Sequence, residues 1–200
     1  DLFGLLYFKN KMKRILVTGV GSLLGQGIIK TIKKSSIKSE IYGTDYFNNA
    51  VGLYWVKEGF ILPDILLKDV KTLDWVKYII KIIKSKKIDY IFPGLDFEIP
   101  IFAKYKKIIE KKTKCVIIVS SKKTVDIFND KWKTVQFLKK KKIIYPQSSL
   151  PKGLKKFINR TKFPYVVKPR FGSTSKNVFY VKNKNELTHA IKNCPKPIIQ

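Results

Sequence analysis

Between Arg14 and Ser120, short continuous apolar runs alternate with longer segments in which apolar residues recur every three or four positions. A continuous run bounded by glycine is typical of a strand buried on both faces, and the longer spacing is typical of an amphipathic helix. Strands that alternate with helices of this length form parallel sheets with right-handed crossovers. The alternation therefore predicts one doubly wound α/β domain over residues 12–120.

The expected elements of this domain follow the alternation. The predicted strands are 14–19, 40–45, 88–94 and 114–120, with 59–63 as the weakest. Helices are expected from Leu24, Ile28, Ile29 and Ile32, from Val70, Leu73, Val76, Ile80 and Ile83, and over 97–111.

The pattern changes after Ser121, where a hairpin replaces the alternation. The expected elements are two helical stretches that meet near Asn129 and Asp130, a loop over 145–153, strands at 164–169 and 177–181, a helix over 184–193 and a strand that begins in "KPIIQ". Two strands separated by a short loop form a hairpin rather than a parallel crossover unit. The sequence stops inside its last strand, so we expect residues 121–200 to be a truncated domain.

The net charge of +28 first suggests a nucleic acid or a membrane surface as partner. Of the 42 basic residues, however, 39 are lysines, and they are scattered over every expected helix and turn. Phosphate and base recognition favours the planar fork of arginine. We attribute the charge mainly to lysine-rich solvated faces and expect no dedicated nucleic-acid partner, although a basic nucleic-acid-binding protein stays among the alternatives.

The cysteine and histidine content and the hydropathy exclude further classes of protein. Cys115 and Cys194 lack CxxC or metal spacing, which fits a reducing cytoplasm, and the single histidine, His189, makes a His-based metal site or a Ser-His-Asp triad improbable. No run approaches the roughly 18 apolar residues of a membrane span, so no membrane partner is expected.

The only methionine, Met12, directly precedes "KRILVTG". We expect it to be the natural start and residues 1–11 to be an extraneous or disordered extension.

A glycine-rich turn, "TGVGSLLGQG", joins the first expected strand to the first helix and contains Gly19, Gly21, Gly25 and Gly27. Glycines here let the backbone approach an anion at the helix N-terminus, and Asp45 stands where a dinucleotide-binding fold holds a ribose hydroxyl. Leu24, however, occupies the third glycine position of G-x-G-x-x-G. Three interpretations stay open: tight packing of the turn, an anion or small-carboxylate site, and the nicotinamide site of an NAD(P)-dependent oxidoreductase.

Asp96 and Glu98 follow another expected strand, at the edge where such sheets bind ligands. Their position predicts that they cap the following helix, with Asp96 near its first turn. A substrate contact or a domain-interface contact is the alternative.

Lys168 ends a strand in "FPYVVKPRFGSTSKNVFYV", residues 163–181. A lysine in a partly closed cleft loses hydration, and an anion offsets that loss. The residues "GSTS", 172–175, can wrap N–H and hydroxyl groups around such an anion. The alternative is a lysine that reaches solvent beside an ordinary hairpin turn.

The order of these elements resembles the ATP-grasp superfamily, particularly members similar to the large chain of carbamoyl-phosphate synthase and to biotin carboxylase. The resemblance covers about residues 12–200 and rests on "DK" (130–131), "FPYVVKPRFGSTS" (163–175), the terminal "IIQ", "YGTD" (42–45) and "PGLDFEIP" (93–100). It implies a Rossmann-like pre-ATP-grasp domain with a parallel sheet over 12–120. The incomplete first α+β subdomain of an ATP-grasp fold would follow over 121–200.

The resemblance also implies an ATP site. Lys131 and Lys168 would contact the nucleotide phosphates, and Gln200 would precede the hinge that holds adenine. The loop that covers the phosphates would consist of Gly172, Ser173, Thr174, Ser175 and Lys176.

The family phosphorylates a carboxylate to an acyl phosphate, which an amine then attacks, so a small-molecule carboxylate and an amine are the implied substrates. The family's Mg²⁺ ligands are expected downstream of Gln200, and the chain alone is therefore expected to bind ATP at most. The oligomeric state stays open, with a homodimer among the alternatives.

Overall fold

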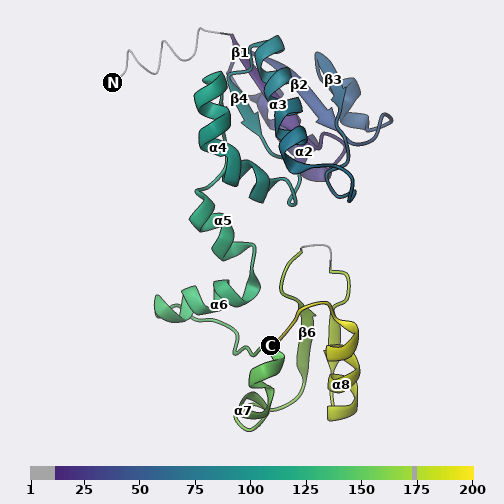
Figure 1. The fold of residues 1–200 in the computed structure, drawn as a ribbon, viewed down its shortest axis with the longest axis vertical. Coiled ribbons are helices and arrows are strands. Elements are labelled where there is room, and N and C mark those ends of the chain that lie inside the picture. Colours follow the sequence, from purple (N-terminus) through teal and green to yellow (C-terminus); the bar gives the residue numbers. More distant parts are fainter. Residues whose placement is uncertain (1–11, 173–174) are drawn as a thin grey trace. The chain divides into compact units, whose positions relative to one another are not determined.

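The structure is a computed structural model that describes residues 12–172 and 175–200 (Figure 1). The chain divides into two compact units, the first ending at Ser120 and the second running from Ser121 to Gln200. The expected N-terminal extension, residues 1–11, lies outside the described residues, as do Ser173 and Thr174. Within the described ranges, no helix combines the length and the apolar character needed to cross a bilayer.

The first unit contains a parallel five-stranded sheet in the order β3-β2-β1-β4-β5, which confirms the predicted α/β class. Its strands are β1 (Lys13–Thr18), β2 (Ser39–Asp45), β3 (Glu58–Ile61), β4 (Tyr90–Phe92) and β5 (Val116–Ile117). The central strand β1 buries Ile15, Leu16 and Val17 in succession, so both of its faces are covered. A continuous apolar run is required for that position.

Helices cover both faces of this sheet. They are α2 (Leu23–Lys34), α3 (Thr72–Lys86) and α4 (Ile99–Thr113), with a 3₁₀ turn η1 at Val51–Trp55. Trp75 of α3 and Phe102 of α4 share a core with Leu16 on one face, and their rings meet edge to face at 5.3 Å. On the other face Ile29 of α2 packs with Ile15 and Val17.

The predicted apolar stripe of α3 was partly wrong. Val70 precedes the helix, and Leu73 is 58% exposed. The residues that are buried are Trp75, Val76, Ile79, Ile82 and Ile83. The doublets Ile79–Ile80 and Ile82–Ile83 allow two overlapping stripes, and the large Trp75 side chain decides between them because its burial removes the most apolar surface from water.

The second unit contains a smaller antiparallel sheet in the order β7-β6-β8. Its elements are α5 (Lys122–Phe128), α6 (Lys131–Lys140), η2 (Pro151–Gly153), α7 (Leu154–Ile158), β6 (Tyr165–Pro169), β7 (Phe179–Val181), α8 (Lys184–Asn193) and β8 (Pro197–Ile199). The predicted hairpin, β6 with β7, is confirmed. The one-turn helix α7 was not predicted, because it lacks a side-chain cap and buries only Phe157.

The two faces of β6 have different surroundings. Tyr165 and Val167 are buried against Leu187 of α8 and Phe157 of α7, which form the core of this unit. Side chains alternate along a strand, so the intervening Val166 and Lys168 lie on the opposite face. That face carries the pocket described below.

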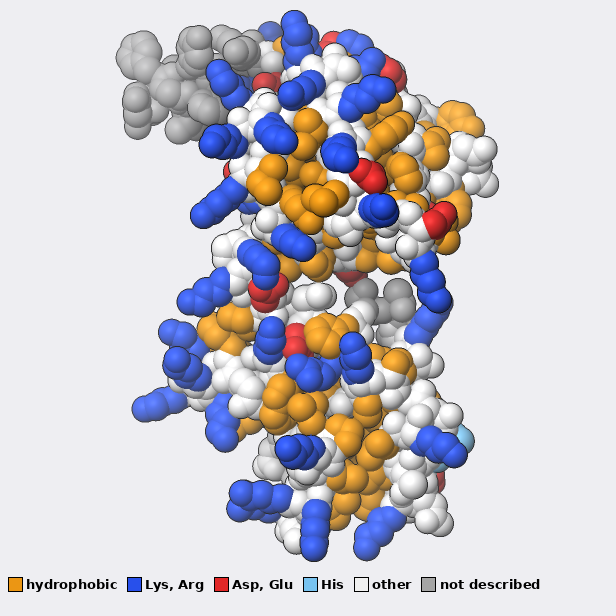
Figure 2. Space-filling model, in the orientation of Figure 1, with side chains coloured by type: hydrophobic (Ala, Val, Ile, Leu, Met, Phe, Trp, Pro, Cys, Tyr) orange, Lys and Arg blue, Asp and Glu red, His pale blue; other side chains and the backbone are white. Residues whose placement is uncertain are grey.

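Basic side chains are spread over the visible surface of both units instead of gathering in one patch (Figure 2). On this face, the distribution is the one expected of solvated lysines.

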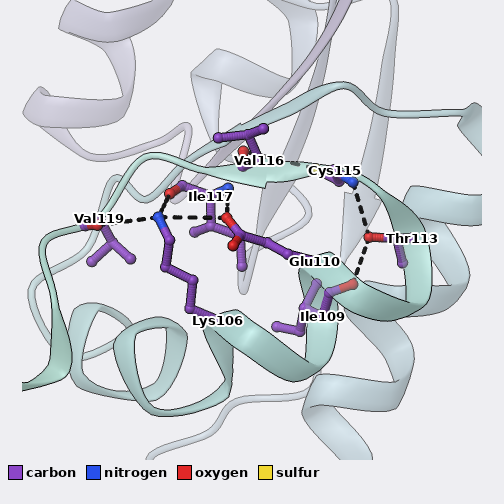
Figure 3. Close-up of polar contacts among 8 residues, drawn as sticks. All are labelled: Lys106, Ile109, Glu110, Thr113, Cys115, Val116, Ile117 and Val119. Carbon is purple, nitrogen blue, oxygen red and sulfur yellow. Dashed lines mark hydrogen bonds and ion pairs between the residues drawn. The ribbon is translucent and has the colours of Figure 1, made fainter.

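Polar side chains of α4 form hydrogen bonds with the backbone of the edge strand β5 (Figure 3). The amides of Val116 and Ile118 bond to the neighbouring strand segment, so the backbone groups of Ile117 face away from it. Glu110 Oε1 accepts from Ile117 N at 2.9 Å, while Lys106 Nζ donates to the Ile117 carbonyl and pairs with Glu110 at 3.4 Å. Exposed sheet edges present unpaired backbone groups, and these contacts give the Ile117 amide and carbonyl partners within the unit.

Replacing Glu110 with alanine is expected to destabilise the chain, because Ile117 N–H then loses its acceptor. A loss of about 1–3 kcal/mol in the free energy of unfolding is expected, measured by urea denaturation. Asp74→Ala is the matched control, since Asp74 pairs with Lys77 on the exposed surface of α3. A loss for Glu110→Ala no larger than that of the control would contradict this account.

Candidate functional site

The glycine-rich turn after β1 is closely packed. Gly19 has a φ of +59°, and a Cβ at that position would lie 2.3 Å from Cγ of Leu95. A Cβ at Gly25 would lie 2.2 Å from the Gly19 carbonyl oxygen. Ser22 caps α2, where its Oγ accepts from Gly25 N at 2.9 Å and donates to the Gly94 carbonyl at 2.9 Å. These contacts favour the packing interpretation of the turn.

The Asp45 carboxylate accepts hydrogen bonds from backbone amides and is not free. Its Oδ2 accepts from Gly21 N at 2.7 Å, and its Oδ1 accepts from the amides of Tyr46 at 2.8 Å and Phe47 at 3.1 Å. The side chain is 5% exposed. Both oxygens are therefore engaged at the position where a dinucleotide fold would use them for a ribose hydroxyl.

The prediction that Asp96 and Glu98 cap the next helix was wrong. Glu98 occupies the N-cap position of α4 but makes no side-chain capping bond, and the exposed Asp96 lies outside the first turn. Proline stands in that first turn and has no N–H, so the helix start has one donor fewer to cap. The Glu98 carboxyl is instead fully buried, where it accepts from the hydroxyls of Thr18 and, at 2.8 Å, Tyr46.

Burial raises the pKa of Glu98 to about 7, although the Thr18 and Tyr46 hydroxyl bonds oppose the rise. The charge of Asp45 adds to it. The pKa of Tyr46 is raised as well, first by burial and then by the Glu98 carboxylate. The carboxyl edge of the first sheet thus carries a buried acid that exchanges its proton near neutral pH.

In the second unit, three lysines line one pocket of about 500 Å³ on the Lys168 face of the sheet. Lys131, Lys168 and Lys176 share this pocket with Gly172 and Ser175. Its other lining residues include Val166, Val178 and Phe171, and none of the described lining residues is acidic. Apolar walls with converging cations suit an organic anion.

The lysines differ in their surroundings. Lys131 Nζ donates to the Gly172 carbonyl at 2.7 Å, at the root of the expected phosphate loop. Burial lowers the pKa of Lys168, and the charge of Lys131 lowers it further. Two ammonium groups that repel each other in a partly desolvated pocket gain from an anion between them.

Asp130 and Arg170 form an ion pair beside these lysines that the sequence reasoning missed. Arg170 Nε donates to Asp130 Oδ1 at 2.9 Å, and Nη2 donates to Oδ2 at 2.6 Å. Asp130 also caps α6 by accepting from the amides of Trp132 and Lys133 at 3.0 and 3.3 Å. An aspartate directly before a helix signals the cap, but nothing local identifies Arg170 as its partner.

Burial would raise the pKa of Asp130, but the hydrogen bonds and charge of Arg170, together with the two capping amides, outweigh it and lower the pKa. Asp130 is 1% exposed, so this charge is held inside the unit by these partners.

Gln200 lies beside the pocket rather than in its lining. Its backbone exchanges hydrogen bonds with Val166 at 2.8 and 2.9 Å, and its Nε2 donates to Ser148 Oγ at 2.8 Å. The structure thus brings Lys131, Lys168, Gly172, Ser175 and Lys176 together with Gln200 as a neighbour. Ser173 and Thr174 lie outside the described residues.

Two family models match the chain, one over the first unit and one over most of the second unit. The family model "PylC-like, N-terminal domain" matches residues 15–119, and the model "ATP-grasp domain" matches residues 128–200. A search of curated protein sequences gave no match.

Solved structures share the fold at low identity. N5-carboxyaminoimidazole synthetase from Staphylococcus aureus, complexed with ADP, is 18% identical with a TM-score of 0.70, over 94% of this chain and 47% of that one. The biotin carboxylase domain dimer of Hydrogenobacter thermophilus 2-oxoglutarate carboxylase, with MgADP, ADP and bicarbonate, is 15% identical with a TM-score of 0.66, over 94% and 43%. L-amino acid ligase from Bacillus licheniformis is 17% identical with a TM-score of 0.67, over 94% and 43%. The chain spans less than half the length of these proteins.

The buried carboxyl of Glu98 gives the chain a testable pH dependence. The unfolded chain ionises near the ordinary pKa of 4.5, whereas the folded chain retains the proton up to about pH 7. Between these values the folded state binds more protons, so the unfolding free energy contributed by Glu98 falls as the pH rises. The total loss is roughly 3 kcal/mol for this difference in pKa.

Urea unfolding at pH 5 and pH 8 measures this effect. Glu98→Gln keeps the size of the side chain and is expected to remove the Glu98 share of the pH dependence, whereas Glu58→Gln, at a partly exposed carboxylate, is expected to retain it. Parallel pH profiles for the native chain and Glu98→Gln would show that Glu98 does not titrate as described.

Proposed function

The chain belongs to the ATP-grasp superfamily, with a PylC-like N-terminal domain, and from this premise we propose that the whole protein is an ATP-dependent ligase that joins a carboxylate to an amine. The observation that carries the proposal is the pocket into which Lys131, Lys168 and Lys176 converge without an acidic residue among its described lining. In this proposal residues 12–120 are the pre-ATP-grasp domain. Residues 121–200 are the first ATP-grasp subdomain.

The pocket binds the phosphates of ATP in this proposal. Lys131 and Lys168 contact the phosphoryl oxygens, and the segment from Gly172 to Lys176 covers them. The bond from Lys131 to the Gly172 carbonyl supports this role, because a phosphate oxygen is a stronger, charge-assisted acceptor that can replace a neutral carbonyl. Gln200, bonded to the pocket residue Val166, precedes the segment that holds adenine.

In the proposed reaction the carboxylate takes the γ-phosphoryl group of ATP and ADP leaves. The amine then attacks the acyl phosphate, forming the C–N bond with release of phosphate and a proton. The two lysines serve this reaction by neutralising charge on the transferring phosphoryl group in a partly dry site. The similar synthetase solved with ADP and the similar biotin carboxylase domain solved with MgADP support ATP and Mg²⁺ as cofactors of the whole protein.

The proposal places the Mg²⁺ ligands outside the described residues. Among them no group of three or more His, Cys, Asp or Glu side chains could hold a metal ion, and Asp130 is already engaged by Arg170. We therefore assign no step to residues of this chain acting through a metal, and propose that the Mg²⁺ ligands lie outside residues 12–200.

The proposed partners are a small-molecule carboxylate and a small-molecule amine. The dimer of the similar biotin carboxylase domain makes a homodimer the assembly to test. We place the protein in the cytoplasm, where its two buried thiols, Cys115 and Cys194, stay reduced.

Lys131→Ala and Lys168→Ala are each expected to weaken ADP binding about tenfold or more, because each removes a charge-assisted hydrogen bond to phosphate. Isothermal titration of the chain with ADP measures the dissociation constant. Lys162→Ala is the matched control, since this exposed lysine of the same unit lies outside the pocket lining.

Titration of the chain with NAD⁺ distinguishes the proposed ligase from the oxidoreductase alternative. Binding of NAD⁺ without binding of ADP, or equal ADP affinities for the pocket variants and the control, would overturn the proposed function.

A further inference from the structure

We propose that the Asp130–Arg170 ion pair is a positioning clamp that holds Lys131 beside Lys168 in the pocket. The inference rests on the proposed function, because holding two lysines together is useful only where both meet one polyphosphate. Neither residue lines the pocket itself. Both act through the lysines that follow or precede them in the sequence.

The clamp joins the start of α6 to the end of β6. The guanidinium of Arg170 meets the Asp130 carboxylate with two nearly parallel hydrogen bonds, at 2.9 and 2.6 Å. The backbone adds a third link at the same place, since Lys131 N donates to the Arg170 carbonyl at 3.0 Å. A two-pronged pair fixes orientation as well as distance, which a single bond does not.

Both lysines stand within two residues of this junction. Lys131 directly follows Asp130, and Lys168 is separated from Arg170 by Pro169 alone, whose ring fixes its φ angle. The charge of Lys131 contributes to the lowered pKa of Lys168, so the two ammonium groups are close enough to repel. Without a mechanical restraint this repulsion separates them, and the clamp provides the restraint.

The pair also keeps a carboxylate away from the lysines. Asp130 is the sequence neighbour of Lys131, yet its oxygens are engaged by Arg170 and by the capping amides of Trp132 and Lys133. It is therefore not free to neutralise the pocket. The lysines stay available for an anionic ligand.

The role also explains why an arginine stands here in a chain whose basic residues are nearly all lysines. Lysine carries the same charge but cannot form the two-pronged contact, so Arg170→Lys tests geometry with the charge retained. Asp130→Asn tests the other partner and keeps an oxygen for the α6 cap. Asp126→Asn is the matched control, because Asp126 forms only an exposed pair with Lys122 on α5.

Two measurements on the folded chain distinguish a clamp that positions Lys131 from an ion pair that only stabilises the fold. The dissociation constant for ADP, measured by isothermal titration well below the melting temperature, is expected to rise about tenfold in Arg170→Lys and in Asp130→Asn. The pKa of Lys168 in Arg170→Lys, which retains every charge, is followed by NMR of ¹³C-dimethylated lysines and assigned with Lys168→Arg; it is expected to rise toward its ordinary value as Lys131 moves away. Asp126→Asn is expected to change neither.

An unchanged Lys168 titration in Arg170→Lys would overturn the clamp, even if the melting temperature falls. If Asp130→Asn fails to fold, Arg170→Lys decides alone. The Lys168 titration needs no nucleotide, so the clamp is tested even if the native chain fails to bind ADP. That failure would overturn the proposed function and leave the clamp as a structural arrangement of two lysines.

Discussion

The burial of β1 on both faces is the constraint on which the first unit depends. Leu16 and Val17 are both inaccessible to solvent, so one helical layer must cover each side of the sheet. Parallel neighbours β2 and β4 then require crossover helices, which place every strand-to-helix connection at one edge. The glycine turn, the loop after Asp45 and the start of α4 meet there because of this topology, not because of sequence proximity.

Several polar groups brought to that edge find partners over long sequence distances, although the buried Thr44 hydroxyl has none among the described residues. Thr18 accepts from Gly94 N at 3.1 Å while its own hydroxyl donates to Glu98, and Tyr46 completes the cluster. An unpaired buried polar group costs more than a made hydrogen bond gains. The cluster therefore explains why Glu98 turns inward although it stands at a helix start.

Local pattern was enough to predict the longer elements but not α7 or the 3₁₀ turn η1. The sheet class, the hairpin and α8 were therefore predicted correctly. Local pattern could not assign side-chain partners, since Thr18 with Glu98 and Asp130 with Arg170 are pairs 80 and 40 residues apart. The face of α3 was ambiguous for a related reason, because packing of Trp75 rather than periodicity chose it. The grouping of Lys131, Lys168 and Lys176 was implied only by family resemblance, and their places in the ATP site stay a proposal.

The surroundings of Lys168 differ from those of the many solvated lysines of this chain. A net charge of +28 spread over solvated side chains is screened within about 10 Å at ordinary ionic strength, so it specifies no ligand. Lys168 differs because partial burial and a neighbouring cation lower its pKa, and because the nearby Asp130 carboxylate is already paired with Arg170. Desolvation makes each charge interact more strongly. In the proposed function, recognition therefore depends on where a few lysines are partly buried and held, which composition alone does not reveal.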